Sequence, residues 1–290
     1  MAIYNELGNK LQTAYDSNGS VLSSAYSADG EKIFPDFVPT TYLNVMSYNV
    51  GQWYNGTLST MPDAQYETYY NLQRGFVTDH EIDILGCQEY SPTFARGHSA
   101  DSVIGELFTD SAKNPASDYQ RKAIYSKYAL NDVTNANYEG HTWGYQKARI
   151  VVDGKDVWLF NTHLATSSAE ANKVAEAKLL FDMVSELDRF IILGDFNTIC
   201  LSPSDTEYTT IMKQFVDAGF NVANCSNQFG FNLTWTESTD RTGVWYPCDH
   251  IITSPNIVMS DVTVDYSKVA VSSVNGVRID HCPIIATLGI

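Results

Sequence analysis

Basic residues are scarce in this chain. Lysine and arginine together number 18 against 34 aspartates and glutamates, which gives a formal net charge of −16 at pH 7. Proteins that grip nucleic-acid backbones normally do so through many lysine and arginine contacts, so this balance argues against that class. It does not exclude an enzyme that handles one phosphate group, since a metal ion and local cations such as Arg121, Lys122 and Lys127 can hold it. The acidic excess itself is typical of a solvated surface that keeps a protein soluble.

Long apolar runs are missing as well. No stretch of about 18 apolar residues occurs, which argues against a transmembrane segment. The first residues, MAIYNELGNK, contain neither a basic patch followed by an apolar segment nor a small-residue cleavage site. We therefore expect a cytoplasmic protein, although a secreted protein whose leader had been removed would look the same.

Cysteines are few, widely scattered and odd in number. None of them forms a C-x-x-C pair; they are Cys87, Cys200, Cys225, Cys248 and Cys282. This spacing favours buried thiols in a reduced compartment over a disulfide framework or a zinc site. Thiolates are soft ligands, and the oxygen-rich neighbours of Cys87 and Cys282 favour a hard cation instead.

The first forty residues contain a short internal repeat. The segment LQTAYDSNG over residues 11–19 recurs as LSSAYSADG over residues 22–30, and each copy ends in a turn signal. The repeat predicts one or two small hairpins, which either pack on the edge of a larger domain or form a mobile attachment module. Pro35 and Pro39 mark the boundary, so we predict an appendage over residues 1–40 and a catalytic domain over residues 41–290.

Beyond residue 40, segments with strand and helix patterns alternate. Apolar spacing predicts helices over residues 63–80, 169–187 and 206–219, the last ending at Gly219. Asp153-Gly154-Lys155 reads as a hairpin turn between strands at 149–152 and 157–161, and later strands are expected at 251–253, 262–266 and 284–288. Hairpins mixed with helical crossovers indicate layered sheets with helices outside.

Five apolar runs end in residues that can hold a metal ion or move a proton. The runs are 43–49, 82–89, 157–163, 190–197 and 276–281. If such strands run the same way in one layered sheet, their ends meet at one rim, where a site can form.

Each motif also has a plain structural interpretation. Asp195 and Asn197 could cap a turn, and His163 could be a hydrogen-bonded structural histidine. Glu89 fits that interpretation less well, because a carboxylate directly after a buried run is costly without a cation or donor beside it. Asn49 could be a turn residue, although its amide oxygen also suits a hard cation.

Taken together, these motifs resemble the endonuclease/exonuclease/phosphatase superfamily. The matching segments, in the family's order, are SYNV at Asn49, QE at Glu89, NTHL at His163, GDFN at Asp195, TW at Trp235, DHI at Asp249 and IDHCP at Asp280 and His281. The resemblance covers roughly residues 41–290. It implies an α/β fold, a four-layered α/β/β/α sandwich of two mixed sheets packed face to face with helices outside. It also implies hydrolysis of phosphate esters that depends on a divalent metal, most often Mg²⁺, with Mn²⁺ as a substitute.

The resemblance assigns roles residue by residue. Asn49, Glu89 and Asp280 would bind the metal. His281, held by Asp249, would act as general base or proton relay.

Three further residues complete the expected site. Asp195 would orient the attacking water, Asn197 would hold a phosphate oxygen, and His163 would donate to the phosphate or assist the leaving group. Family members differ on which group is the acid and which the base. Gly51 departs from the pattern, since several nucleases of the family carry an acidic residue there.

The substrate stays open at this stage. We expect a monomeric phosphodiesterase of nuclease type; a sphingomyelinase-like activity, an inositol-phosphate phosphatase and a catalytically silent binding module are the alternatives. Gln52, Trp53, Tyr54 and Tyr90 could form an aromatic platform for a base or sugar, or merely pack at the rim. Tyr125 could line the site or lie in the core, His250 reads as structural, and His80, His98 and His141 have no motif support.

Overall fold

The structure, a computed structural model, describes most of the chain past residue 38. The described residues are 39–51, 55–114, 121–166, 169–226, 228–236, 245–267 and 281–290. The hairpin repeat, the segment 52–54 and Asp280 lie outside them, so the predictions made for these segments stay predictions.

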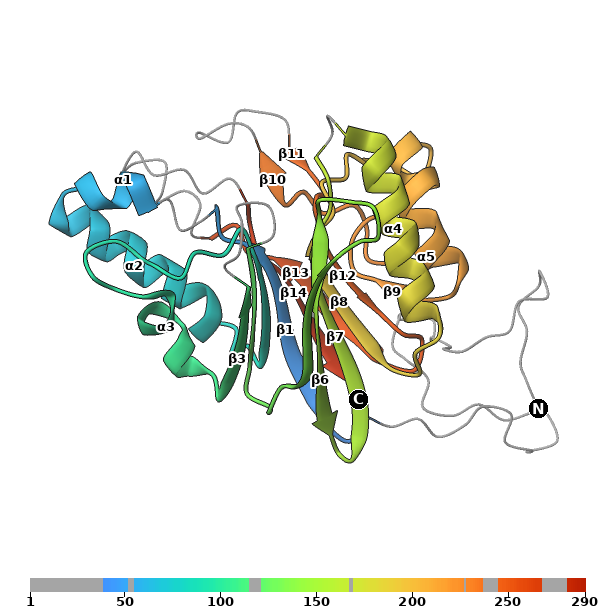
Figure 1. Cartoon of the computed structure of the whole chain (residues 1–290), viewed down its shortest axis with the longest axis horizontal. Helices are drawn as coiled ribbons and strands as arrows, with labels where there is room; N and C mark the ends of the chain where they lie inside the picture. The colour runs from blue at the N-terminus through green and yellow to red at the C-terminus, as the bar shows by residue number, and fades with distance from the viewer. Residues whose placement is uncertain are drawn as a thin grey trace.

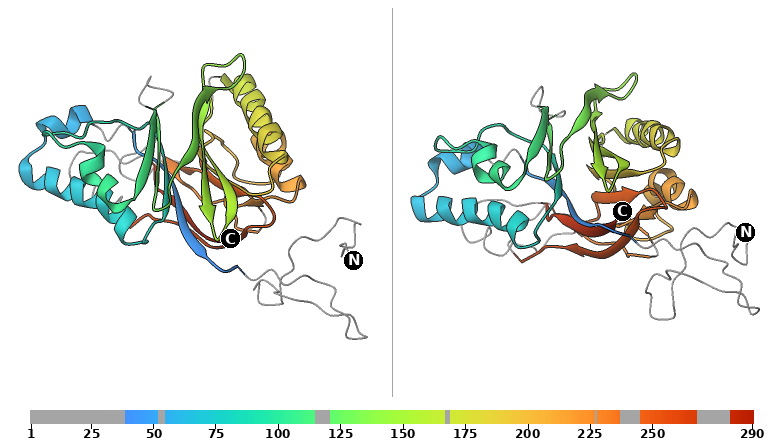
Figure 2. Two further views of the ribbon diagram at one scale, coloured as in Figure 1. Left: turned by 60° about the horizontal axis from the view of Figure 1, so that its bottom comes forward. Right: turned by 90° about the horizontal axis from the view of Figure 1, so that it is seen from below.

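Two six-stranded sheets pack face to face, and helices cover both outer faces (Figure 1). The first sheet has the order β13-β14-β1-β2-β4-β3 and the second the order β5-β6-β7-β8-β12-β9, each with parallel and antiparallel pairs. Figure 2 shows the helices flanking the two sheets from further directions. This arrangement confirms the predicted four-layered α/β sandwich.

The strands and helices have the following bounds. The first sheet contains β1 (Tyr42–Asn49), β2 (Ile84–Gln88), β3 (Asp110–Asn114), β4 (Lys122–Ser126), β13 (Val258–Val264) and β14 (Ile284–Gly289). The second contains β5 (Asn131–Asn137), β6 (Gly144–Val152), β7 (Lys155–His163), β8 (Phe190–Asp195), β9 (Asn221–Val222) and β12 (Asp249–Thr253). A small ribbon pairs β10 (Trp235–Thr236) with β11 (Trp245–Tyr246). The helices are α1 (Asn55–Thr60), α2 (Asp63–Thr78), α3 (Ala100–Val103), the short turn η2 (Gly105–Leu107), α4 (Glu170–Ser185), the π-helical η4 (Tyr208–Met212) and α5 (Lys213–Asp217).

The predicted hairpin between β6 and β7 is confirmed. Its turn residues Asp153 and Gly154 have φ values of 50° and 74°, the pair of positive angles that a type I′ turn needs. After β7, helix α4 crosses over to β8, which runs parallel to β7. The hairpin and the crossover together bring the C-terminal ends of β7 and β8 to the same side.

The predicted helices are also confirmed, with shifted ends. The third one, expected over 206–219, contains the π-helical turn η4 in its middle, and Gly219 follows it with φ 76°. The sequence did not predict β3 and β5, which are edge strands rich in polar residues. An edge strand needs no apolar face when one side is open to water, so β5 carries no period-2 signal.

A buried polar contact joins the two sheets just below the polar ends of their strands. The side chain of Asn161 on β7 donates to the backbone oxygens of Cys87 and Ala123, 2.9 Å each, and accepts from Gln88 at 2.7 Å. Nearby, a Cβ atom on Gly86 would lie 2.8 Å from Leu193, so only glycine allows the sheets to approach this closely. These contacts fix the distance between the strand ends of the two sheets.

One expectation about the cysteines is wrong. Cys200 and Cys225 form a disulfide, although they are 25 residues apart and lie in no recognisable pattern. Cys87, Cys248 and Cys282 are buried free thiols, as predicted. Among the described residues, no helix is both long and apolar enough to cross a membrane.

Candidate functional site

The polar ends of six strands lie at one rim of the sandwich, the upper end in Figure 1. Strands β1, β2, β7 and β8 end there, as expected from the sequence. Strands β12 and β14 run in the opposite direction and begin there. Asp249 therefore opens a strand, and His281 lies just before β14. Residues 276–280 lie outside the described part of the chain, so the expected strand over 276–281 stays a prediction.

Three site residues form a row across the second sheet. His163 is in register with Asp195 on the parallel strand β8, and Asp195 is in register with Asp249 on β12. Register partners project from the same face of a sheet. This face is the one that packs against the first sheet, because Leu193 and Ile251, two residues away on the same strands, lie in the core between the sheets.

The first sheet contributes Asn49, Glu89 and His281 to the same place. The side-chain amide of Asn49 donates to Asp195 Oδ2 at 2.9 Å and to Glu89 Oε1 at 3.3 Å. Nε2 of His281 lies 3.7 Å from Asp195 Oδ2, and Nε2 of His163 lies 3.5 Å from the same oxygen. We call the group Asn49, Glu89, His163, Asp195, Asp249 and His281 the rim site.

The imidazole of His281 is oriented by a carboxylate. Its Nδ1 lies 2.9 Å from Asp249 Oδ2, and both side chains are buried. A carboxylate at Nδ1 favours the tautomer in which that nitrogen carries the proton, so Nε2 can accept a proton on the side that faces Asp195. Thr234 holds Asp249 in place, since its Oγ1 accepts the backbone N–H of Asp249 at 2.9 Å.

Burial and crowded charge dominate the electrostatics. Burial raises the pKa of the Asp195 carboxyl, and the neighbouring Asp249 raises it further, while His281 and the amide of Asn49 oppose the shift. Burial lowers the pKa of His163 well below its usual range, and the positive charge of Lys122 lowers it further. His163 is thus a neutral imidazole, and the edge of its ring meets the Trp143 ring at 4.7 Å between centroids.

Asn197 joins two loops beside Asp195. Its backbone N–H donates to Asp195 Oδ1 at 2.8 Å, and its side chain donates to the backbone oxygen of Leu164, next to His163, at 2.9 Å. Lys173 on α4 is fully buried and donates to the Asn197 carbonyl at 2.8 Å and to Glu207 at 2.5 Å. These hydrogen bonds fix the loop that follows β8.

The sequence interpretation missed several of these supporting residues. For Lys173 a signal existed, because it precedes the buried positions Ala177, Leu180 and Val184 at helical spacing on α4. Thr234 belongs to the TW motif at Trp235, although the motif does not say what the threonine contacts. Trp143 carries no comparable signal, because it lies just before β6 and its partner His163 is distant in sequence.

The rim site fits a divalent cation. Ligand atoms of Asp195, Asp249 and His281 lie within 4.8 Å of one another, and all three residues are buried. Within the described part of the chain, Asp249 Oδ1 is a buried acceptor with no hydrogen-bond partner. Two adjacent buried carboxylates with a spare acceptor oxygen are the donor set that a hard cation prefers.

Two of the three predicted metal ligands, Glu89 and Asn49, lie at the rim site, and they differ in how their oxygens are oriented. Glu89 is half-buried at the rim site, and its own backbone has a φ of 50°. Asn49 presents its NH₂ group to the carboxylates, whereas its Oδ1 accepts the backbone N–H of Gly51 at 3.0 Å. In this orientation Asn49 bridges two carboxylates and does not aim its oxygen at a cation.

Two residues left open by the sequence lie in the core. Tyr125 and Tyr90 are buried and their rings pack together at 6.4 Å, so neither forms an exposed platform. His250 points away from the rim site, toward Thr198 Oγ1 at 2.7 Å, and burial lowers its pKa to about 4. This placement agrees with a structural role for His250.

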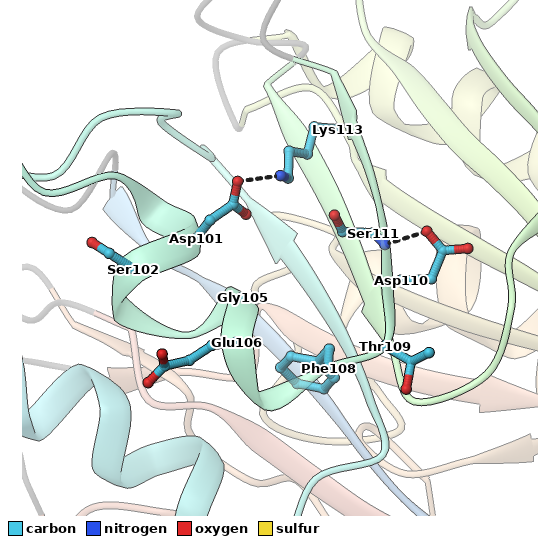
Figure 3. Close-up of a pocket in the computed structure, with 9 residues that line it drawn as sticks. All are labelled: Asp101, Ser102, Gly105, Glu106, Phe108, Thr109, Asp110, Ser111 and Lys113. Atoms are coloured by element: carbon cyan, nitrogen blue, oxygen red, sulfur yellow. Dashed lines mark hydrogen bonds and ion pairs between the residues drawn. The ribbon is translucent and has the colours of Figure 1, made fainter.

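The surface also carries a hollow of about 440 Å³ between α3, η2 and β3 (Figure 3). It shares no residue with the rim site. Asp101 pairs with Lys113 and Glu106 with Arg74, at 2.6 Å each. Asp110 accepts the backbone N–H groups of Ser111 and Leu130. We therefore place no chemistry there.

A known family has a sequence model that matches this chain over residues 59–272, under the description "Endonuclease/Exonuclease/phosphatase family". The chain belongs to the endonuclease/exonuclease/phosphatase family. Members of this family are generally phosphoesterase hydrolases that use divalent metals. No curated protein matches the sequence significantly.

Solved structures share the fold at low sequence identity. A truncated Caenorhabditis elegans TDP2 is 16% identical with a TM-score of 0.59, covering 87% of this chain and 99% of its own. D. rerio TDP2, complexed with a single-strand DNA product, is 13% identical with a TM-score of 0.59, covering 86% of this chain and 100% of its own. The 3′-5′ exonuclease NExo from Neisseria meningitidis is 17% identical with a TM-score of 0.58, covering 84% and 98%.

Proposed function

We propose that this protein hydrolyses phosphodiester bonds of nucleic acid with the help of a divalent cation, Mg²⁺ in the first place. The observation that carries the proposal is the rim site. Acidic, amide and imidazole groups from six separate segments gather around Asp195, and each has a polar atom within 3.7 Å of another member of the group.

The cation would be held by Glu89 together with carboxylate oxygens of the rim site and, as the family resemblance implies, by Asp280. When bound, it supplies positive charge that stabilises the phosphate oxygens and draws the substrate into an otherwise acidic site.

The side chains of the rim site supply the proton transfers. His281, held at Nδ1 by Asp249, has Nε2 on the side of Asp195 and would there take a proton from water. Asp195 orients that water as an acceptor. His163, neutral and buried beside Asp195, is placed to donate a hydrogen bond to a phosphate oxygen or to the leaving group.

Nucleic acid is the substrate class that the comparisons favour. The D. rerio TDP2 structure holds a single-strand DNA product, and NExo is a 3′-5′ exonuclease. The acidic surface of this chain means that the cation and a few local side chains, not a broad basic face, would bind the backbone.

The first experiment is hydrolysis of bis-p-nitrophenyl phosphate with Mg²⁺ or Mn²⁺, with and without chelator. We expect turnover that chelator abolishes. Asp195→Ala and His281→Ala should each lose at least about 100-fold in turnover, since each removes a group that acts in the reaction. The matched controls Asp188→Ala and His98→Ala alter residues outside the rim site and should keep normal turnover.

A substrate panel tests the second half of the proposal. Plasmid DNA, single-stranded RNA, sphingomyelin and inositol polyphosphates should be offered to the same preparation. Cleavage of nucleic acid with no release from the lipid or the inositol phosphates is the expected outcome. Hydrolysis of sphingomyelin or inositol phosphates alone would replace the nuclease assignment, and turnover that survives chelator would end the metal assignment.

A further inference from the structure

Lys122 is a buried lysine at the edge of the rim site. It is the first residue of β4 and is in register with Gln88, the residue that precedes Glu89. Gln88 faces the other sheet, because its side chain donates to Asn161 across the interface. Register partners share a face, so Lys122 also lies between the sheets, at the end where the rim site forms.

The ammonium group of Lys122 has no partner in the described part of the chain. The residue is 1% exposed, yet no hydrogen bond or ion pair to a described residue engages it. Asp195 accepts hydrogen bonds from Asn49 and Asn197 instead, and Asp249 pairs with His281. Among the described residues, Lys173 is the other fully buried lysine, and it forms an ion pair with Glu207, as buried lysines usually do with an acidic residue.

A buried ammonium without a partner is costly to the fold. Burial lowers the pKa of Lys122 to about 7, and the charge of Glu176 offsets only part of this effect. Lys122 is near enough to the rim site to lower the pKa of His163 as well. An anion that binds beside the ammonium would offset this cost.

We propose that Lys122 binds a phosphate oxygen of the substrate, as a cation that belongs to the protein and does not depend on the metal. The identity of the anion rests on the proposed function, while the placement of the positive charge does not. Lys122 would contribute charge on the side of the first sheet, opposite His163 on the second. Its burial is no obstacle, because Asp195, Asp249 and His163 are buried to the same degree.

A structural role is the competing explanation. The side-chain oxygen of Gln88 is also buried without a hydrogen-bond partner among the described residues, so a water molecule could bridge it to Lys122. In that case Lys122 would stabilise the fold, and its replacement by an apolar residue would destabilise it.

The test compares Lys122→Met with the wild-type full chain. Lys127→Met is the matched control. Lys127 directly follows the other end of the same strand, away from the rim site, and pairs with Asp83 at 2.9 Å, so the role in phosphate binding considered for it from the sequence does not apply. Binding of inorganic phosphate is measured by calorimetry in chelator-treated protein, and Tm is measured for each variant. Hydrolysis of bis-p-nitrophenyl phosphate with Mg²⁺ is the second readout.

We expect Lys122→Met to bind phosphate about tenfold more weakly or worse, with an equal or higher Tm and reduced turnover. Lys127→Met should match the wild type in phosphate binding and turnover. Unchanged phosphate affinity in Lys122→Met, or a lower Tm with normal affinity, would overturn the inference. If the wild type bound phosphate through Lys122 but hydrolysed nothing, the proposed function would fail and this inference would stand.

Discussion

The disulfide between Cys200 and Cys225 leads to a stability prediction of defined size. It closes a loop that begins three residues after Asn197 and ends beside Asn224, whose side chain donates to the backbone oxygen of Asp249 at 3.0 Å. Reducing it, or replacing both cysteines by alanine, removes this constraint from the unfolded chain. The perturbation leaves the rim-site side chains themselves unchanged.

The magnitude follows from the length of the loop. With a separation of 25 residues, the loop-closure relation gives a stabilisation of about 3.5 kcal/mol at 25 °C. For a chain of 290 residues, whose unfolding entropy is about 0.6 kcal/mol/K, this corresponds to a loss of about 6 °C in Tm.

Urea unfolding with and without reductant measures the effect. The midpoint of the wild type should fall in reductant, whereas that of Cys200→Ala/Cys225→Ala should be low already and insensitive to reductant. Titration of the denatured, unreduced protein should find three free thiols, Cys87, Cys248 and Cys282. Five free thiols, or a midpoint that reductant leaves unchanged, would refute the reasoning.

Two further predictions concern buried polar groups. The pKa of His250 is about 4 in the fold and 6.5 when unfolded, so the unfolded state binds more protons between these values. The contribution of His250 to the free energy of unfolding should therefore be fully present above about pH 6.5, and about 3 kcal/mol of it should be lost as the pH falls toward 4. His250→Gln should remove this pH dependence. The same pH dependence in the wild type and the variant would contradict the prediction. Asn161→Ala should cost about 3 kcal/mol or more, because it leaves two buried carbonyls without donors, whereas the exposed control Asn131→Ala should stay within about 0.5 kcal/mol. Equal unfolding midpoints for the two variants would reject the inter-sheet role of Asn161.

The layers of the fold were predictable because their signals are local. Apolar runs such as that before Asp195, and the turn at Asp153 and Gly154, identify strands and a hairpin from neighbouring residues alone. The row formed by His163, Asp195 and Asp249 follows from strand register once the strands are known to be adjacent. What periodicity cannot supply is the direction of β12 and β14, which begin at the rim where the other four strands end.

Contacts between distant segments were not predictable from spacing. The pairing of Cys200 with Cys225 depends on two loops that meet only in the fold, and the spacing of the cysteines argued for free thiols. The orientation of Asn49, with its NH₂ toward Asp195, depends on which groups surround it. Edge strand β5 was not predicted, because its residues are open to water and need no alternation of apolar and polar side chains.

The central claim is that the rim site binds a divalent cation. Diffraction from crystals soaked in Mn²⁺, recorded at the manganese absorption edge, tests it most directly. We expect an anomalous peak among the carboxylates of the rim site, absent from crystals of Glu89→Ala. A soaked wild-type crystal with no peak among Asn49, Glu89, Asp195, Asp249 and His281, or with its Mn²⁺ at another face of the molecule, would contradict the account.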